Sequence, residues 1–337
     1  MLKLKKNKAY VIAEIGINHE GKLSHAIALI KNAKRSGADA VKFQVFDPET
    51  IAYKNQKKSS LQKKVISKKE SLHEMWERVA LNINQLKILK KVSKKLKIDF
   101  ICSIFDDYSY NIIKKIKVDA IKVASSDITD VVLLNKIKEL KCQIILSTGM
   151  ANHNEINNAL RILRNNRVFL LHCVSLYPCP DKLANLKRIN SLKIYKKIVG
   201  YSDHCIGINA SLIAISMGAR IIEKHFTLNK YKKGADHILS ADKNDLKLIC
   251  DFAKNSQLFL GSGKIKPTVY ELSFRKNFRK GIFFKKDISK NDIITEEHLI
   301  IRRPQSNTKI ESYYKILGKR INKKIFEGEE VNLKNIF

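Results

Sequence analysis

The stretch YVIAEIGINHEGKLSHAIALIKNAKRSGADAVKFQV, residues 10–45, decides the fold. It begins with a short apolar run, Tyr10–Ile15, and ends with a second one, Ala40–Val45. Between the two runs, residues 24–36 carry apolar side chains at helical spacing. Parallel strands need a long crossover connection, which is usually a helix. The stretch therefore predicts a strand-helix-strand unit of a parallel sheet.

The same pattern continues along the chain. Further apolar runs that predict strands are Phe100–Ile104, Ala120–Val123, Gln143–Ser147, Val168–Cys173, Ile198–Tyr201 and Ile221–Phe226. The helical candidates are Ile83–Lys97, Tyr108–Lys117, Val131–Leu140, Asn154–Arg164, Ile208–Met217 and Asp245–Leu260. Eight such units in about 250 residues predict an α/β fold of the (β/α)8 TIM-barrel type. An open doubly wound sheet is the alternative, but no glycine-rich dinucleotide-binding turn follows the first run.

Two segments depart from this alternation. A polar, lysine-rich insertion, Asp47–Lys69, follows the second strand, and we expect it to form a loop over the barrel mouth. From Arg279 onward, short strands and turns replace the strand-helix alternation. The sequence therefore predicts a barrel domain over residues 1–262, a linker over 263–278 and a small domain over 279–337.

The chain is strongly basic. Its 337 residues include 65 Lys and Arg against 32 Asp and Glu, which gives a formal net charge of +33. The excess is mostly lysine spread over the whole length, without a basic arm or zinc-finger spacing. We therefore expect a solvated surface and no nucleic-acid partner, although the same positive field would attract an anionic substrate.

Cysteine usage and hydropathy bear on the cellular compartment. The six cysteines, Cys102, Cys142, Cys173, Cys179, Cys205 and Cys250, form no CxxC pair and lie in or near apolar runs. This indicates reduced, buried thiols. Glu14 cuts the first apolar segment too short for a secretory signal, and no apolar run reaches membrane-spanning length. We expect a cytoplasmic protein with no membrane partner.

Chemistry in a TIM barrel is expected at the carboxyl ends of the strands. Nearly every predicted strand ends in polar residues, namely Glu14, Lys42, Gln44, Ser103, Lys122, Ser125, Asp127, Ser147, Thr148, Ser175, Tyr177, Ser202, Asp203, His204, Lys224 and His225. A lysine that points into a barrel is costly unless an anion meets it. Lys42 and Lys122, with the hydroxyls of Ser125 and Ser147, suit a ligand with both phosphate and carboxylate groups. For either lysine alone, a position in water at the rim is the simpler interpretation.

Two histidines follow neighbouring strands. His204 and His225 end strands seven and eight, so both imidazoles can reach one point and hold a catalytic divalent metal such as Mn²⁺. The alternative is a hydrogen-bonded structural histidine. Further candidate ligands are His19, His172 and His237, and zinc held with Cys173 or Cys205 is a weaker option.

The motifs in chain order resemble the sialic acid synthase family. They are AEIGINHEG (13–21), VKFQ (41–44), KVAS (122–125), LSTGM (146–150), LLHCVSLYPCP (170–180), GYSDH (200–204), EKHFT (223–227) and GADH (234–237). The tail, with IRRP at 301–304, resembles the family's small antifreeze-like SAF domain of the β-clip type. The resemblance covers nearly the whole chain.

The resemblance implies a reaction and a division of roles. The reaction is the condensation of phosphoenolpyruvate with N-acetylmannosamine or a related 2-acetamido sugar, plus water, to give a nonulosonic (sialic) acid and phosphate. Phosphoenolpyruvate would be held by Lys42, Ser103, Lys122, Ser125, Ser147, Ser175 and Ser202. The metal, Mn²⁺ with Mg²⁺ or Co²⁺ as alternatives, would be held by His204 and His225. Glu14, Gln44, Asp127, Tyr177 and Asp236 would surround the sugar, and Glu14 or Asp127 would position the water.

The resemblance also implies a domain-swapped homodimer. The small domain of one subunit would reach the other subunit's barrel and supply Arg303, with Arg302 as a rival, to the acetamido end of the sugar. Departures from the family pattern are CSIF (102–105), Asp127, Ser175 and Gln305, and they leave the sugar open. N,N'-diacetyllegionaminate or pseudaminate synthesis is therefore an alternative. A basic nucleic-acid-binding scaffold without catalysis is the alternative from another class.

Overall fold

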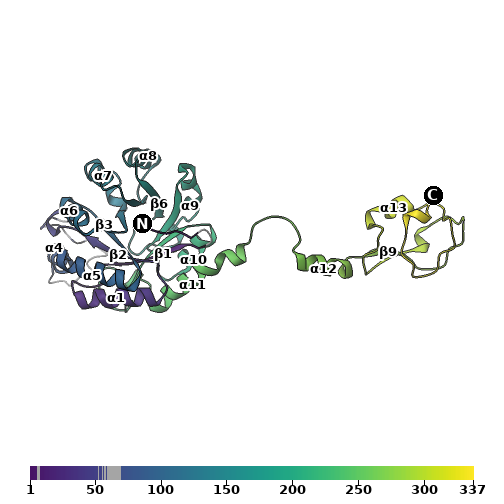
Figure 1. The fold of residues 1–337 in the computed structure, drawn as a ribbon, viewed down its shortest axis with the longest axis horizontal. Coiled ribbons are helices and arrows are strands. Elements are labelled where there is room, and N and C mark those ends of the chain that lie inside the picture. The colour runs from purple at the N-terminus through teal and green to yellow at the C-terminus, as the bar shows by residue number, and fades with distance from the viewer. Residues whose placement is uncertain (6–7, 52, 55, 57, 59–69) are drawn as a thin grey trace. The chain divides into compact units, whose positions relative to one another are not determined.

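The computed structural model describes residues 1–5, 8–51, 53–54, 56, 58 and 70–337. The chain divides into two compact units, Met1–Gly261 and Ser262–Phe337. Within the described residues, the first unit is a closed parallel barrel of eight strands in chain order (Figure 1). Its first strand pairs with its last, which excludes an open sheet and confirms the predicted TIM barrel.

The strands and helices of the barrel lie close to the predicted positions. The strands are β1 (Tyr10–Gly16), β2 (Ala40–Val45), β3 (Asp99–Ile104), β4 (Ala120–Val123), β5 (Gln143–Ser147), β6 (Arg167–Cys173), β7 (Ile198–Asp203) and β8 (Ile221–His225). The helices are α1 (Leu23–Arg35), α2 (Pro48–Ile51), α4 (Leu72–Val79), α5 (Ile83–Leu96), α6 (Asp107–Ile116), α7 (Val131–Lys138), α8 (His153–Ile162), α9 (Arg188–Ser191), α10 (Asn209–Ser216) and α11 (Lys243–Leu260). Short 3₁₀ helices are η1 (Ser125–Asp127), η2 (Asp181–Leu183), η3 (Leu192–Tyr195) and η4 (His237–Leu239).

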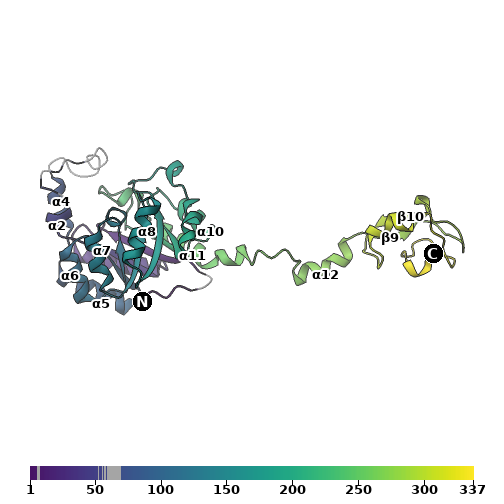
Figure 2. The same cartoon turned by 90° about the horizontal axis from the view of Figure 1, so that it is seen from above.

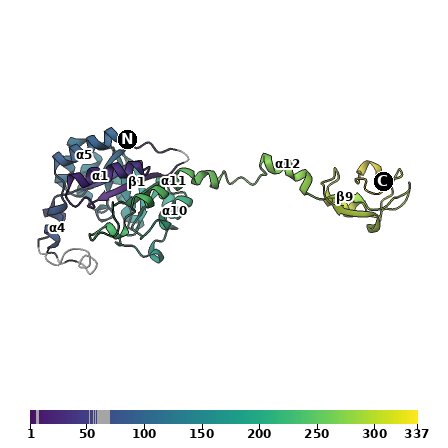
Figure 3. The same cartoon turned by 90° about the horizontal axis from the view of Figure 1, so that it is seen from below.

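Local capping explains where several of these helices begin. Asn82, Asp106, Asn152 and Asp242 each accept a hydrogen bond from the first turn of α5, α6, α8 and α11, in reciprocal capping boxes. The helices cover the outside of the strands, and α1 packs against α5 (Figure 3). The site therefore rests on a rigid, two-layered frame.

Alternate residues of each strand face the barrel interior. Near the amino ends of the strands, these positions form an inner apolar cluster that includes Tyr10, Ile12, Ala40, Ile101, Ala120, Ile145, Phe169, Leu171 and Ile221. Two residues further along five of the strands, the same face carries Glu14, Lys42, Ser103, Lys122 and Ser147. The intervening residues pack under the helices, and Cys102 of the unusual CSIF motif is one of them. That departure therefore leaves the inward-facing Ser103 in place.

The second unit has its own small core. It contains α12 (Val269–Phe278), the antiparallel pair β9 (Gly281–Phe284) and β10 (Leu299–Arg302), η5 (Glu296–His298), η6 (Ile310–Ser312), α13 (Tyr313–Ile316) and η7 (Leu333–Asn335). Nine buried residues form the core: Ile282, Phe284, Ile288, Ile294, Leu299, Ile316, Ile321, Ile325 and Val331. The segment expected as a linker, 263–278, contains α12.

Three other expectations concern the insertion, the thiols and the membrane. In the predicted insertion Asp47–Lys69, α2 occupies the beginning, and most of the remainder lies outside the described residues. The six cysteines are free, and all except Cys142 are buried. No helix in the described part of the chain is long and apolar enough to cross a membrane.

Candidate active site

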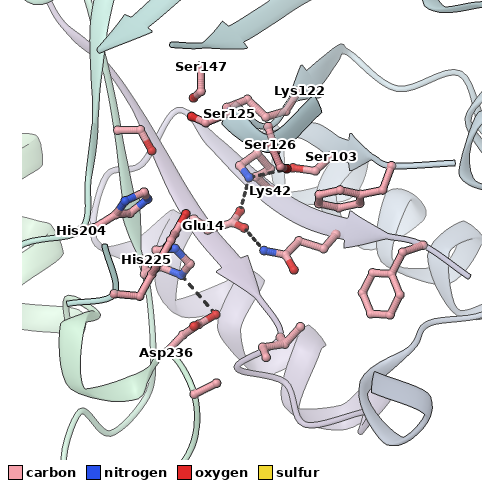
Figure 4. A pocket seen from close by; sticks show the side chains of 18 of the residues that line it. Glu14, Lys42, Ser103, Lys122, Ser125, Ser126, Ser147, His204, His225 and Asp236 are labelled. Atoms are coloured by element: carbon pink, nitrogen blue, oxygen red, sulfur yellow. Dashed lines mark hydrogen bonds and ion pairs between the residues drawn. The ribbon is translucent and has the colours of Figure 1, made fainter. Parts of the chain in front are cut away.

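A cavity of about 850 Å³ lies at the carboxyl ends of the barrel strands (Figure 4). Thirteen of the fifteen predicted site residues line it: Glu14, Lys42, Gln44, Ser103, Lys122, Ser125, Asp127, Ser147, Tyr177, Ser202, His204, His225 and Asp236. Ser175 lies just behind the lining, against Gly149. Arg303 belongs to the second unit. The residues predicted from the strand ends thus come from all eight strands or the loops that follow them, and most of them line one cavity.

Charged side chains form the floor of the cavity. The Lys42 ammonium lies 3.0 Å from Glu14 Oε2 and 3.7 Å from Glu223 Oε2, and it donates a 2.9 Å hydrogen bond to Ser103 Oγ. Lys122 Nζ lies 4.0 Å from Glu223 Oε1 and donates to the carbonyl of Val123. The protein itself therefore supplies part of the anionic charge that buried lysines require.

Burial and pairing set the charges on this floor. Burial, opposed by Lys42, raises the pKa of Glu14 to about 7. Burial also disfavours the charged form of Glu223, but Lys122 and Lys42 together lower its pKa. Burial lowers the pKa of Lys122, whereas Glu14 and Glu223 outweigh burial and raise that of Lys42. The floor accordingly combines a firmly charged lysine with a carboxyl that titrates near neutrality.

Glu223 is the main floor residue that the sequence analysis did not assign to the site. It accepts a 2.7 Å hydrogen bond from Ser202 Oγ and lies between the two lysines. A signal was available, because Glu223 and His225 are two positions apart on one strand and face the same side.

A pocket of hydroxyl groups surrounds Gly149. The backbone N–H of Gly149 donates a 3.0 Å hydrogen bond to Ser125 Oγ. A Cβ atom at this position would approach Ser175 Oγ to 2.5 Å and Ser125 Oγ to 2.8 Å, so only glycine fits. Among the described residues, the buried hydroxyls of Ser147 and Ser175 have no hydrogen-bond partner. These hydroxyls remain available to the oxygens of a ligand.

His204 and His225 lie on one side of the cavity, with ring centroids 5.7 Å apart (Figure 4). His204 Nδ1 lies 2.8 Å from the carbonyl oxygen of Val174, so Nδ1 carries the proton and Nε2 keeps its lone pair. His225 Nδ1 lies 3.5 Å from Asp236 Oδ2 and makes no hydrogen bond within the described residues. Burial lowers the pKa of His204 to about 4 and that of His225 well below its usual value. Both rings are therefore neutral near pH 7, the form that ligates metals.

The other candidate histidines do not line the cavity. His172 bonds the carbonyl of Ala184 and stacks on Tyr201, and His237 bonds Thr227 Oγ1. His19 Nδ1 accepts from the backbone of Gly21. Each of the three thus makes a structural hydrogen bond, while His172 Nδ1 has no partner among the described residues.

The part of the cavity nearer the entrance combines carboxyl groups with an apolar wall. Gln44 donates to Glu14 Oε1 at 3.1 Å, and burial raises the pKa of Asp127 and of Asp236 to about 6. Asp127 Oδ2 is buried and unpartnered in the described structure. Apolar lining residues are Ile17, Phe46, Ile51, Met75, Trp76, Phe105, Ala235 and Ile238. A ligand that fits must pair an ionic end with a partly apolar end.

Residues 29–265 match the NeuB family, and residues 279–333 match the SAF domain. The chain belongs to the NeuB family. It is 39% identical over 328 residues to the N,N'-diacetyllegionaminic acid synthase of Campylobacter jejuni, covering 96% of this chain and 98% of that protein. It is 31% identical to the pseudaminic acid synthase of Helicobacter pylori, covering 93% of each chain.

Solved structures agree with this assignment. The crystal structure of an N-acetylneuraminic acid synthetase from Leptospira borgpetersenii, in complex with citrate, superposes with a TM-score of 0.70 at 32% identity, covering 81% of this chain and 93% of that one. The resemblance found in the sequence is thereby confirmed, and NeuB relatives carry names of sialic, legionaminic and pseudaminic acid synthases.

In this NeuB chain, Arg302 and Arg303 belong to the SAF unit. The guanidinium of Arg303 lies 5.4 Å from the ring centre of Phe278, and that of Arg302 lies 5.2 Å from the ring centre of Phe283. Both arginines are exposed and make no ion pair within the described residues. An aromatic support of this kind orients a guanidinium without neutralising it.

Proposed function

We propose that this NeuB-family chain condenses phosphoenolpyruvate with a 2-acetamido sugar of the mannose type and water, releasing a nonulosonic acid and phosphate. The observation that carries the proposal is one cavity that combines two buried lysines, unpartnered serine hydroxyls, two neutral histidines and two carboxyls with raised pKa values. Relatives named as synthases of such acids support it.

Phosphoenolpyruvate fits the floor of the cavity. Its phosphate and carboxylate need cations and hydroxyl donors, which Lys42, Lys122 and the serines around Gly149 provide. Because Lys42 already contacts Glu14 and Glu223, an incoming anion competes with these carboxylates. Protonation of Glu14, whose pKa is about 7, then reduces the repulsion between protein and ligand.

The histidine pair fits a divalent metal. Neutral rings, a free Nε2 on His204 and an orphaned Nδ1 on His225 are the features that such an ion requires. When bound, the ion would act as a Lewis acid on the aldehyde of the open-chain sugar, and Mn²⁺ suits the imidazole and oxygen donors present. The C2=C3 π electrons of phosphoenolpyruvate then form the bond from C3 to the aldehyde carbon, which leaves C2 electron-deficient and the former aldehyde oxygen as an alkoxide that takes up a proton.

Water must next add to C2 of the former phosphoenolpyruvate. We assign the positioning of this water to Asp127, because its buried Oδ2 makes neither a hydrogen bond nor an ion pair among the described residues. Glu14 Oε2 likewise accepts no hydrogen bond, but it lies 3.0 Å from the Lys42 ammonium, and Glu14 Oε1 accepts from Gln44. Asp127 would take up the water proton as the C2–O bond forms. Cleavage of the C2–O bond to the phosphate group gives the keto acid and inorganic phosphate.

The apolar wall favours one kind of acceptor. Trp76 and Phe105 each lie near Phe46, with ring centres 5.1 and 6.4 Å from it, and these rings suit methyl groups better than hydroxyls. A 6-deoxy sugar with a second acetamido group presents such methyl groups, as in a legionaminate-type acceptor, whereas N-acetylmannosamine presents two hydroxyls at the corresponding carbons. We therefore propose the diacetamido sugar as the preferred acceptor.

The test is a phosphate-release assay with phosphoenolpyruvate, Mn²⁺ and a panel of 2-acetamido and 2,4-diacetamido sugars. Release should require both metal and sugar, and should be fastest with the diacetamido sugar. His225→Ala should abolish it, and the exposed His153→Ala should not. Absence of release with every sugar in the panel would refute the proposed reaction.

A further inference from the structure

A second group of metal-ligating side chains lies on α2 and α4, outside the cavity. Glu49 comes from α2, and His73 and Glu77 come from α4, one helical turn apart. The two helices lie side by side at one edge of the barrel unit (Figure 2). One ligand atom from each of the three residues lies within 4.8 Å of the other two.

The distances fit donors that share one ion. His73 Nε2 lies 3.4 Å from Glu49 Oε1 and 3.6 Å from Glu77 Oε1. A tetrahedral metal with bonds of about 2.1 Å holds its donor atoms about 3.4 Å apart. His73 Nε2 thus lies close to a carboxylate oxygen of both glutamates. Because His73 and Glu77 are one helical turn apart, their side chains lie on the same face of α4.

The burial of His73 is the independent observation. The residue is only 6% exposed, yet neither ring nitrogen makes a hydrogen bond in the part of the chain that the structure describes. An unpaired buried nitrogen costs free energy, which a bound ion would offset. Glu49 and Glu77 are more than half exposed, so an ion can reach them from solvent. The exposed Lys54 lies 3.4 Å from Glu49, and a bound cation would have to displace its ammonium group.

We propose that Glu49, His73 and Glu77 bind one divalent cation of the Zn²⁺ class, with water completing its coordination. One imidazole and two carboxylates are ligands typical of that ion. The cation links α2 to α4. Because α2 carries Ile51 and α4 carries Met75 and Trp76, all of which line the cavity, the cation fixes the apolar wall from behind.

The experiment uses the full-length chain, stripped of metal and titrated with Zn²⁺ by calorimetry, with bound zinc counted after desalting. His73→Gln and Glu77→Gln should each bind one zinc fewer per chain than the wild-type protein. Glu139→Gln, the same change at an exposed glutamate that follows α7, should bind as the wild type does. Zinc should raise the melting temperature of the wild type more than that of either variant.

The His225→Ala variant distinguishes this site from the histidine pair of the cavity. It should lose the zinc bound in the cavity and keep the zinc that His73→Gln loses. Glu77→Gln changes only an exposed side chain, so it remains informative if His73→Gln does not fold. Equal zinc content in wild type, His73→Gln and Glu77→Gln would overturn the proposal and leave the proposed synthase reaction untouched.

Discussion

Glu14 and Lys42 lie opposite each other on β1 and β2, with their charged atoms 3.0 Å apart and both side chains almost fully buried. The same ammonium group lies 3.7 Å from Glu223, so one cation serves two carboxylates. Such a group is stable only while its members remain together, since removing one leaves a charge buried without compensation. Several expected outcomes depend on this arrangement.

Lys42→Met removes the ammonium charge and keeps most of the side-chain volume. The free energy of unfolding at pH 8 should fall by about 3–5 kcal/mol, the usual cost of breaking a buried ion pair from one side. The loss should be smaller near pH 5, where Glu14 is protonated in the folded state. Urea denaturation at the two pH values measures both effects. Lys247→Met breaks an exposed pair with Asp251 and should lower the free energy of unfolding far less than Lys42→Met does. Equal losses in the two variants would show that burial adds nothing to the Lys42 pair.

Glu223→Gln keeps the shape of the side chain but removes the carboxylate between the two lysines. Lys42 and Lys122 are then less compensated, so the KM for phosphoenolpyruvate should fall. The charged carboxylate that holds Ser202 and the two lysines in position is lost, so kcat should fall by about tenfold. Steady-state kinetics with varied phosphoenolpyruvate separates the two effects. A higher KM would show that Glu223 does not oppose the ligand.

Protonation of Asp127 should lower the reaction rate on the acidic side of the pH–rate profile. Burial raises its pKa to about 6, and a base must be ionised, so kcat should fall as the pH drops through about 6. Asp127→Asn should lower kcat by on the order of 100-fold, and Asp127→Glu should restore most of it. An unchanged acidic limb in Asp127→Asn would assign the water to another group, Glu14 first.

The free energy of unfolding of Asp127→Asn provides a second test of the raised pKa of Asp127. Because the pKa of Asp127 is raised in the folded state, the protonated side chain stabilises the fold. This contribution to the free energy of unfolding is complete below about pH 3.8 and is lost as the pH rises through about 6. Asp127→Asn cannot ionise, so its unfolding free energy should increase relative to wild type between pH 4 and pH 7.5.

Arg303 is the predicted contact of the SAF unit with the sugar in a homodimer. Arg303→Ala should raise the KM for the sugar by about tenfold and leave that for phosphoenolpyruvate unchanged. If the arginine acts on the partner's barrel, re-equilibrated equal mixtures of Arg303→Ala and His225→Ala chains, assayed at a sugar concentration far below KM, should reach about a quarter of wild-type activity and exceed either variant alone, because one site in four is complete. No regain on mixing would refute the shared site, and Arg302→Ala is the matched control.

The fold could be predicted largely from the sequence. The apolar strand runs and the helical periodicity between them depend only on local pattern, and the seven predicted helices end within two residues of the observed ones. The cavity lining followed from one topological rule, that parallel strands bring their carboxyl ends to one face.

The remainder of the site depends mainly on contacts between elements. The spacing of Glu223 and His225 places Glu223 on the inner face of its strand, but only its distances to Lys42 and Lys122 on other strands show that it lies between two lysines. Met75 and Trp76 lie on α4, which the sequence analysis did not single out, and they reach the cavity only through packing of that helix over the barrel mouth. His73 looks like an ordinary polar helix residue until its burial and the position of Glu49 are known.

The inner apolar cluster of the barrel, from Tyr10 and Ile12 to Ile221, has a kinetic consequence. It fills the barrel interior near the amino ends of the strands with buried side chains, and the described cavity lies at the carboxyl ends. If the chain carries out the proposed reaction, phosphoenolpyruvate on the lysine floor is expected to bind before the sugar beside Trp76. Product-inhibition kinetics would then show ordered addition of the two substrates.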